Sequence, residues 1–173
     1  MNDQKIRTLV LTALMTALCA VMTTVIKIPS PMGGYFNLGD CAVLLSAWLL
    51  GPGWGAAAAG VGSALSDLQG FPLYAPATLV IKALMAAAAG WLFQQYRESV
   101  QRRALAPRLV SGGVAECTMI AGYFGFEAVL LGMGPGAAAN IPFNLAQGVV
   151  GVVSATAVMS LLNRVPGLPV QRH

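Results

Sequence analysis

Apolar residues dominate six stretches of the chain, and polar residues, prolines and glycines occupy the short stretches between them. This pattern predicts helices over residues 6–26, 41–50, 54–64, 77–93, 109–132 and 138–162. A helix needs about 20 apolar residues to cross a hydrocarbon core of roughly 30 Å. The sequence therefore predicts an all-α integral membrane protein whose six transmembrane helices form a single domain, residues 1–173.

The central feature of the pattern is a predicted hairpin of two apolar helices within residues 34–67. Gly51-Pro52-Gly53 interrupts the apolar run, because proline removes a backbone donor and glycine favours turns. Charged and amide side chains lie only at the two far ends, which carry Asn37, Asp40 and Asp67. Each arm, counted with its flanking residues, has about 14 to 16 apolar residues and gives only about 22 Å of helix, so a single span broken at the turn is the alternative.

The distribution of basic residues decides between these two topologies. If the chain crosses the membrane six times, eight of its ten lysines and arginines fall on one side. The eight are Lys5, Arg7, Arg97, Arg102, Arg103, Arg108, Arg164 and Arg172. Cytoplasmic loops carry an excess of such residues, so the hairpin is favoured and both termini are predicted in the cytoplasm.

Composition excludes a soluble protein and gives no sign of a nucleic-acid partner. Hydrophobic residues make up 57% of the chain and charged residues 9%, as expected for a protein within a lipid bilayer. The net charge of +4 comes from arginines in one short loop and at the termini, where membrane orientation explains them. Cys19, Cys41 and Cys117 lie far apart, and the single histidine, His173, is the last residue. We therefore predict neither a metal site nor a cofactor.

The first predicted helix carries a stripe of small residues. Ala13, Ala17 and Ala20 recur at positions i, i+4 and i+7, and such a stripe lets another helix approach closely. The spacing fits packing within this protein and an interface with a different subunit equally well.

A lysine lies well inside the fourth predicted helix. Lys82 is six residues from the start of that helix, where an unpaired ammonium group is costly. Asp67 is the nearest acidic residue in the sequence, across the connecting loop. We predict an ion pair between Asp67 and Lys82, with a ligand contact by Lys82 as the alternative.

Most polar residues of the membrane segments gather near one end of the predicted bundle. Such groups either line a cavity or join helices by hydrogen bonds. We predict a substrate-binding pocket with contacts from Asn37, Asp40, Tyr74, Lys82, Glu127, Asn140 and Asn144. The opposite half holds Glu116, to which the sequence assigns no role.

This distribution predicts a cup that opens outward. A channel or a complete secondary transporter would carry polar groups through the midplane. The chain has no glycine–lysine motif for nucleotide phosphates, so a partner must supply the energy for uptake. An intramembrane enzyme or a small efflux protein is the alternative class. The enzyme is disfavoured because the sequence has no HExxH motif and no serine with a nearby histidine.

The segments GGYFNLGD, LLGPGWGAAAAGVGSALSD, YAPATLVIKAL, GYFGFE and IPFNLAQ occur in this order along the chain. With them the sequence resembles the substrate-binding S components of energy-coupling factor (ECF) transporters, which take up vitamins in prokaryotes. The resemblance covers nearly the whole chain and is strongest to the riboflavin-type branch, whose members carry several vitamins and precursors.

The resemblance implies a multi-pass protein of the prokaryotic cytoplasmic membrane that is a transport subunit rather than an enzyme. It implies an external pocket closed by loops, which would hold a ligand such as pyridoxine, hydroxymethylpyrimidine or riboflavin. It also implies a complex with a transmembrane coupling subunit and two ATPase subunits. The AxxxA motif of the family matches Ala13 and Ala17, which would dock the coupling subunit.

Overall fold

A computed structural model describes residues 3–30, 33–99 and 105–164. The long helices are α1 (Asp3–Val25), α2 (Gly39–Asp67), α3 (Ala75–Ser99), α4 (Leu105–Gly125) and α5 (Ile141–Leu162). Strands β1 (Ile28–Pro29) and β2 (Tyr35–Phe36) pair antiparallel between α1 and α2. A π-helix, η1 (Phe126–Leu130), extends α4, and a 3-10 helix, η2 (Gly134–Asn140), leads into α5. The prediction of an all-α membrane bundle is confirmed.

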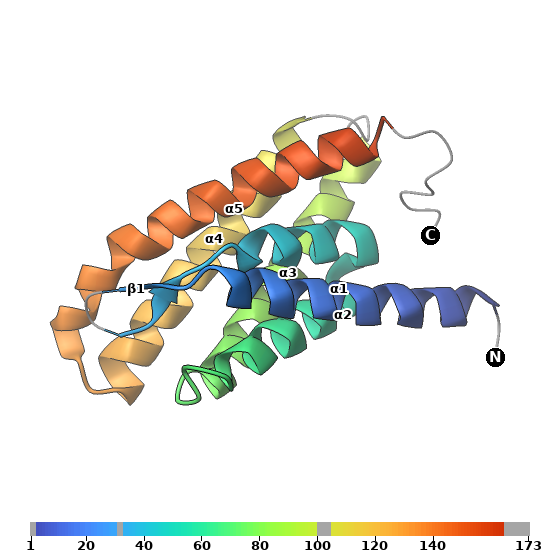
Figure 1. The fold of residues 1–173 in the computed structure, drawn as a ribbon. Helices are drawn as coiled ribbons and strands as arrows, with labels where there is room; N and C mark the ends of the chain where they lie inside the picture. Colours follow the sequence, from blue (N-terminus) through green and yellow to red (C-terminus); the bar gives the residue numbers. More distant parts are fainter. Residues whose placement is uncertain (1–2, 31–32, 100–104, 165–173) are drawn as a thin grey trace.

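The helices form an elongated bundle with different structures at its two ends (Figure 1). One end, on the left of the view, carries the β1–β2 hairpin and the η1–η2 connection. The first turns of α1 and the last turns of α5 lie at the opposite end. Arg102, Arg103, Arg172 and His173, which entered the sequence predictions, lie outside the described residues.

The structure has five long helices in its described part where the sequence predicted six, because α2 contains both arms of the predicted hairpin. Only Gly51 leaves helical geometry, with φ 78° and ψ −177°, and glycine adopts this φ readily. A Cβ placed on Gly55 would lie 2.8 Å from the Cα of Ala47. Residues eight apart in a straight helix are separated by about 12 Å. The chain therefore folds back on itself at Gly51.

The α2 hairpin is the centre of the bundle and packs against α1, α3 and α5. Residues 41–48 of its first arm are all buried, whereas α1 buries only Cys19 and Thr23. Glycine permits the close contact between α1 and α2, since a Cβ on Gly62 would lie 2.7 Å from the Cβ of Cys19. Large apolar side chains remain exposed on α1, α3, α4 and α5, as expected of helices that face lipid.

Candidate functional site

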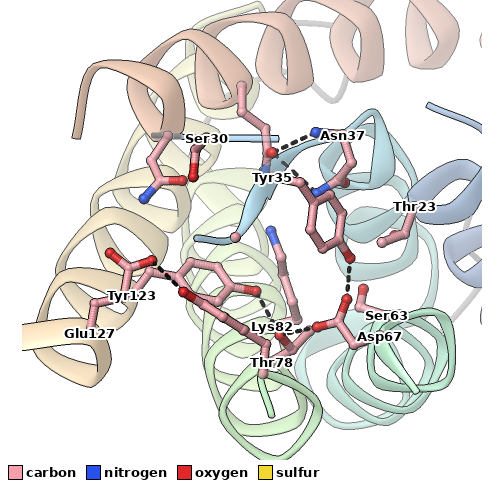
Figure 2. A pocket seen from close by; sticks show the side chains of 14 residues that line it. Thr23, Ser30, Tyr35, Asn37, Ser63, Asp67, Thr78, Lys82, Tyr123 and Glu127 are labelled. Carbon is pink, nitrogen blue, oxygen red and sulfur yellow. Dashed lines mark hydrogen bonds between the residues drawn. The ribbon is translucent and has the colours of Figure 1, made fainter. Parts of the chain in front are cut away.

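A polar pocket opens at the end of the bundle that carries the β1–β2 hairpin (Figure 2). Its empty volume is about 420 Å³ including the opening to solvent. The lining residues come from every long helix and from the β1–β2 segment: Thr23, Ser30, Gly34, Tyr35, Asn37, Ser63, Asp67, Tyr74, Thr78, Lys82, Tyr123, Glu127, Asn144 and Gln147. The space between these side chains is narrow, so a vitamin-sized ligand must displace some of them as it enters.

The floor of the pocket is a buried ion pair with an amide beside it. The Lys82 ammonium group contacts the Asp40 carboxylate and also lies 3.2 Å from Sδ of Met119. Gln147 donates from Nε2 to the second oxygen of Asp40 at 2.7 Å. Its Oε1 accepts from the backbone and side-chain amides of Asn37 at 2.8 and 3.1 Å. The floor thus links α2, α3 and α5 to the segment that follows β2.

The predicted ion pair between Asp67 and Lys82 is wrong, because Lys82 pairs with Asp40 instead. The hairpin brings Asp40 and Asp67 to the same end of the bundle, and both face α3. Thr78 and Lys82 are four residues apart and so share one face of α3. The outer of the two, Thr78, donates to Asp67 at 2.5 Å, which leaves the deeper Lys82 to Asp40.

Asp67 forms the second anchored carboxylate of the pocket. One oxygen accepts a hydrogen bond from the Tyr35 hydroxyl and the other accepts from Thr78, whose oxygen lies 3.0 Å from the Tyr123 hydroxyl. Burial, together with the charge of Asp67, raises the pKa of Tyr35, so that phenol keeps its proton. Tyr35 therefore ties the β1–β2 hairpin to the end of α2.

Glu127 forms the third carboxylate and lies in the π-helix η1. Its side chain is buried, and the Tyr74 hydroxyl donates to Oε1 at 3.4 Å. Burial and the charge of Glu127 raise the pKa of Tyr74. The other oxygen, Oε2, has no hydrogen-bond partner among the described residues. Its position is compatible with a ligand contact.

The structure brings together five of the seven predicted contact residues. Asn37, Tyr74, Lys82, Glu127 and Asn144 line the pocket. Asp40 and Asn140 are not among the lining residues. Asp40 pairs with Lys82 in the floor, and Asn140 donates from Nδ2 to the carbonyl of Gly33, the residue before the lining residue Gly34, at 3.2 Å. Contact with a ligand stays a prediction for all seven.

Sequence reasoning missed several lining residues that carry hydroxyl groups. They are Thr23, Ser30, Tyr35, Ser63, Thr78 and Tyr123. Serine and threonine are common at helix contacts in membranes, so their types alone gave no signal. The tyrosine in GGYF and the one in GYFGFE lie within the quoted motifs, and those motifs could have pointed to them.

Glu116, to which the sequence assigned no role, and the predicted docking residues Ala13 and Ala17 lie away from the pocket. Glu116 is buried beside Gly148 and Gly151, and neither of its carboxylate oxygens has a hydrogen-bond partner within the described chain. Ala13 and Ala17 are exposed on α1. Ala17 and the buried Cys19 are two residues apart, so they point to opposite sides of the helix. Ala13 and Ala17 thus face away from the bundle, whereas Ala20 is half-buried.

These features define a helical membrane protein with a polar pocket at one end. The crystal structure of the S-component for biotin from an ECF-type ABC transporter has the same fold, with a TM-score of 0.68, 95% of each chain covered and 16% sequence identity. The family model for the S component of ECF-type riboflavin transporters matches residues 3–164. This chain therefore belongs to that family.

A relative from Pyrococcus woesei, named as an uncharacterized protein in the gap 3′ region, is 40% identical over 134 residues, which is 77% of this chain and 86% of the relative. The resemblance inferred from the sequence motifs is confirmed by the family match. The chain is a vitamin-binding, multi-pass membrane subunit of an ECF transporter, and its family consists of transport subunits rather than enzymes.

Proposed function

We propose that this protein captures a small polar heterocycle of the pyridoxine, hydroxymethylpyrimidine or riboflavin class from outside a prokaryotic cell. The observation that supports this function is the position of the polar pocket at the end of the bundle that carries the β1–β2 hairpin. Beneath it, the Asp40–Lys82 pair and the buried first arm of α2 fill the interior. A ligand can enter such a site from one side and needs another subunit to leave on the other.

The pocket would face outward if both termini lie in the cytoplasm, as the basic residues predict. Leu73 is 66% exposed in the loop at the pocket end, and Gly53 is exposed at the turn of α2, at the other end. In a background without native cysteines, Leu73→Cys should react with an impermeant maleimide on intact cells. Gly53→Cys should react only after permeabilisation. The reverse labelling would contradict an external pocket.

Uptake would require a transmembrane coupling subunit and two ATPase subunits, because the chain has no nucleotide-binding motif of its own. We propose that Ala13 and Ala17 form the contact with the coupling subunit, since both are exposed and small residues permit close helix packing. Ala17→Trp should abolish copurification of the coupling subunit and leave ligand affinity unchanged. Leu14→Trp, at an exposed position off the stripe, is the control. Loss of ligand binding in Ala17→Trp would exclude a pure docking role.

Calorimetry with the purified protein tests the binding function directly. Asn144 lines the pocket, and its neighbour Leu145 is exposed on the outer side of α5. Loss of one neutral hydrogen bond costs about 0.5 to 1.5 kcal/mol, or roughly 2- to 13-fold in affinity. Asn144→Ala should weaken binding on this scale, and Leu145→Ala should not. Equal affinities in both variants would place the ligand elsewhere.

A further inference from the structure

The hydroxyl hydrogens of the three pocket tyrosines are already used within the protein. Tyr35 donates to Asp67, and Tyr74 donates to Glu127. Thr78 has one hydroxyl hydrogen and gives it to Asp67, so Thr78 must accept the hydrogen of Tyr123. Each phenol then has only acceptor lone pairs left for a ligand.

The cation and the amide in the floor are occupied as well. Lys82 is 98% buried against Asp40 and the sulfur of Met119, and its charge is neutralised by Asp40. Gln147 donates to Asp40 and accepts twice from Asn37. An anionic ligand could therefore reach a positive partner only by disrupting the ion pair between Asp40 and Lys82.

A second lysine near the mouth is also engaged. Lys27 donates to the carbonyl of Ser66 at 3.0 Å. Its ammonium group lies over the rings of Tyr35 and Phe71, at 4.7 and 5.8 Å from their centroids. It does not line the pocket. The mouth thus offers no free cation among the described residues.

Within the described part of the chain, the buried pocket-lining groups left without partners are a carboxylate oxygen and hydroxyls. Glu127 is 97% buried and lines the pocket. Its carboxylate lies beside the Tyr74 hydroxyl and the Asn140 amide, and its Oε2 has no partner in hydrogen-bond geometry among the described residues. The hydroxyls of Thr23 and Ser63 are also buried, unpartnered and in the pocket wall. Figure 2 shows Glu127 on one side and Thr23 and Ser63 on the other. A ligand lying between them would meet a carboxylate at one end and two hydroxyls at the other.

Resting on the function proposed above, we infer that the ligand is a nitrogen heterocycle that carries an amino group or a protonated nitrogen toward Glu127, and no carboxylate. Two lining carboxylates, Asp67 and Glu127, face a single lysine whose charge Asp40 cancels. A donor on the ligand completes the unpaired oxygen of Glu127, and a positive charge complements the excess of acidic groups. Asn144 can donate or accept, so it does not alter this preference.

Pairs of compounds that share one ring and differ in one substituent test this inference by calorimetry. The probes are pyridoxamine, pyridoxine and 4-pyridoxic acid, together with nicotinamide and nicotinate. We expect pyridoxamine to bind at least tenfold more tightly than 4-pyridoxic acid, and nicotinamide more tightly than nicotinate. Tighter binding of either carboxylate overturns the inference and leaves the proposed function standing. Failure of every probe and of hydroxymethylpyrimidine and riboflavin overturns both.

The Glu127→Gln variant tests which residue produces the preference. A hydrogen bond to a charged group is worth about 10- to 150-fold in affinity. We expect Glu127→Gln to weaken pyridoxamine binding on this scale while it changes pyridoxine binding less. Asn144→Ala, which removes a pocket amide and no charge, should weaken both compounds equally. An unchanged ratio of amine to alcohol affinity in Glu127→Gln would overturn the inference, and the melting temperature of each variant shows that it is folded.

Discussion

Replacing Lys82 with methionine removes the positive member of the pocket floor. Asp40 is fully buried and Lys82 is 2% exposed, so the variant leaves a carboxylate in the interior with Gln147 as its one remaining side-chain donor within the described chain. Breaking a buried pair by removing one partner costs about 3 to 5 kcal/mol. For a chain of this length each kcal/mol shifts the melting temperature by roughly 2 to 4 °C. Lys82→Met should therefore melt on the order of 10 °C below the parent protein.

Thermal melting of the purified protein in detergent, followed by tryptophan fluorescence, measures this loss. Adding Asp40→Asn to Lys82→Met should recover most of it, because the double variant buries no uncompensated charge. Adding Asp67→Asn instead is the matched control, since Asp67 is held by Tyr35 and Thr78 rather than by Lys82. It should recover nothing.

Two results would refute this account of the floor. One is a Lys82→Met protein that melts like the parent. The other is recovery by Asp67→Asn and not by Asp40→Asn, which would restore the pair suggested by sequence proximity. An unchanged melting temperature combined with lost ligand binding would make Lys82 a ligand contact rather than a structural cation.

Three further variants address the α2 hairpin, the buried Glu116 and the mouth of the pocket. Gly55→Ala should lower the melting temperature sharply, because its Cβ would lie 2.8 Å from backbone of the facing arm. Gly53→Ala, with open space around it, should not. Glu116→Met should melt at or above the parent temperature, since it removes two unpartnered buried oxygens; a loss of several degrees would show that the carboxylate is needed. Phe71→Ala should speed ligand release in stopped-flow measurements, because Phe71 stacks on the β1–β2 hairpin, whereas the exposed Leu73→Ala should leave the rate unchanged.

The hairpin and the location of the pocket were predictable from local sequence. Gly51-Pro52-Gly53 breaks an otherwise continuous apolar run, because proline removes a backbone donor and glycine favours turns. Polar residues at both ends of the hairpin must then meet. The two predicted arms form one helix, α2, because only one residue between them, Gly51, departs from helical geometry. This is why the structure has five long helices in its described part rather than six.

The partner of Lys82 was not predictable in this way. Proximity along the chain favoured Asp67, fifteen residues before Lys82, over Asp40, forty-two residues before it. What decides the pairing is depth along α3, where Thr78 meets Asp67 one turn outside Lys82. The same limit applies to Tyr35 and Tyr123, because the direction of a hydroxyl depends on acceptors from other helices.

Gln147 joins the binding site to the stability of the bundle. Its carbonyl oxygen holds Asn37, in the segment that leads from β2 into α2, and its amide nitrogen holds Asp40 in the ion pair. A ligand that moves Asn37 on entry must therefore disturb Gln147, and through it the Asp40–Lys82 pair. Ligand affinity and melting temperature should change together in variants of Asn37 and Gln147. The same hydrogen bonds position the pocket residue Asn37 and stabilise the buried Asp40–Lys82 pair. Asn144 lines the pocket and forms no hydrogen bond to the floor within the described residues, so its variants should change affinity alone.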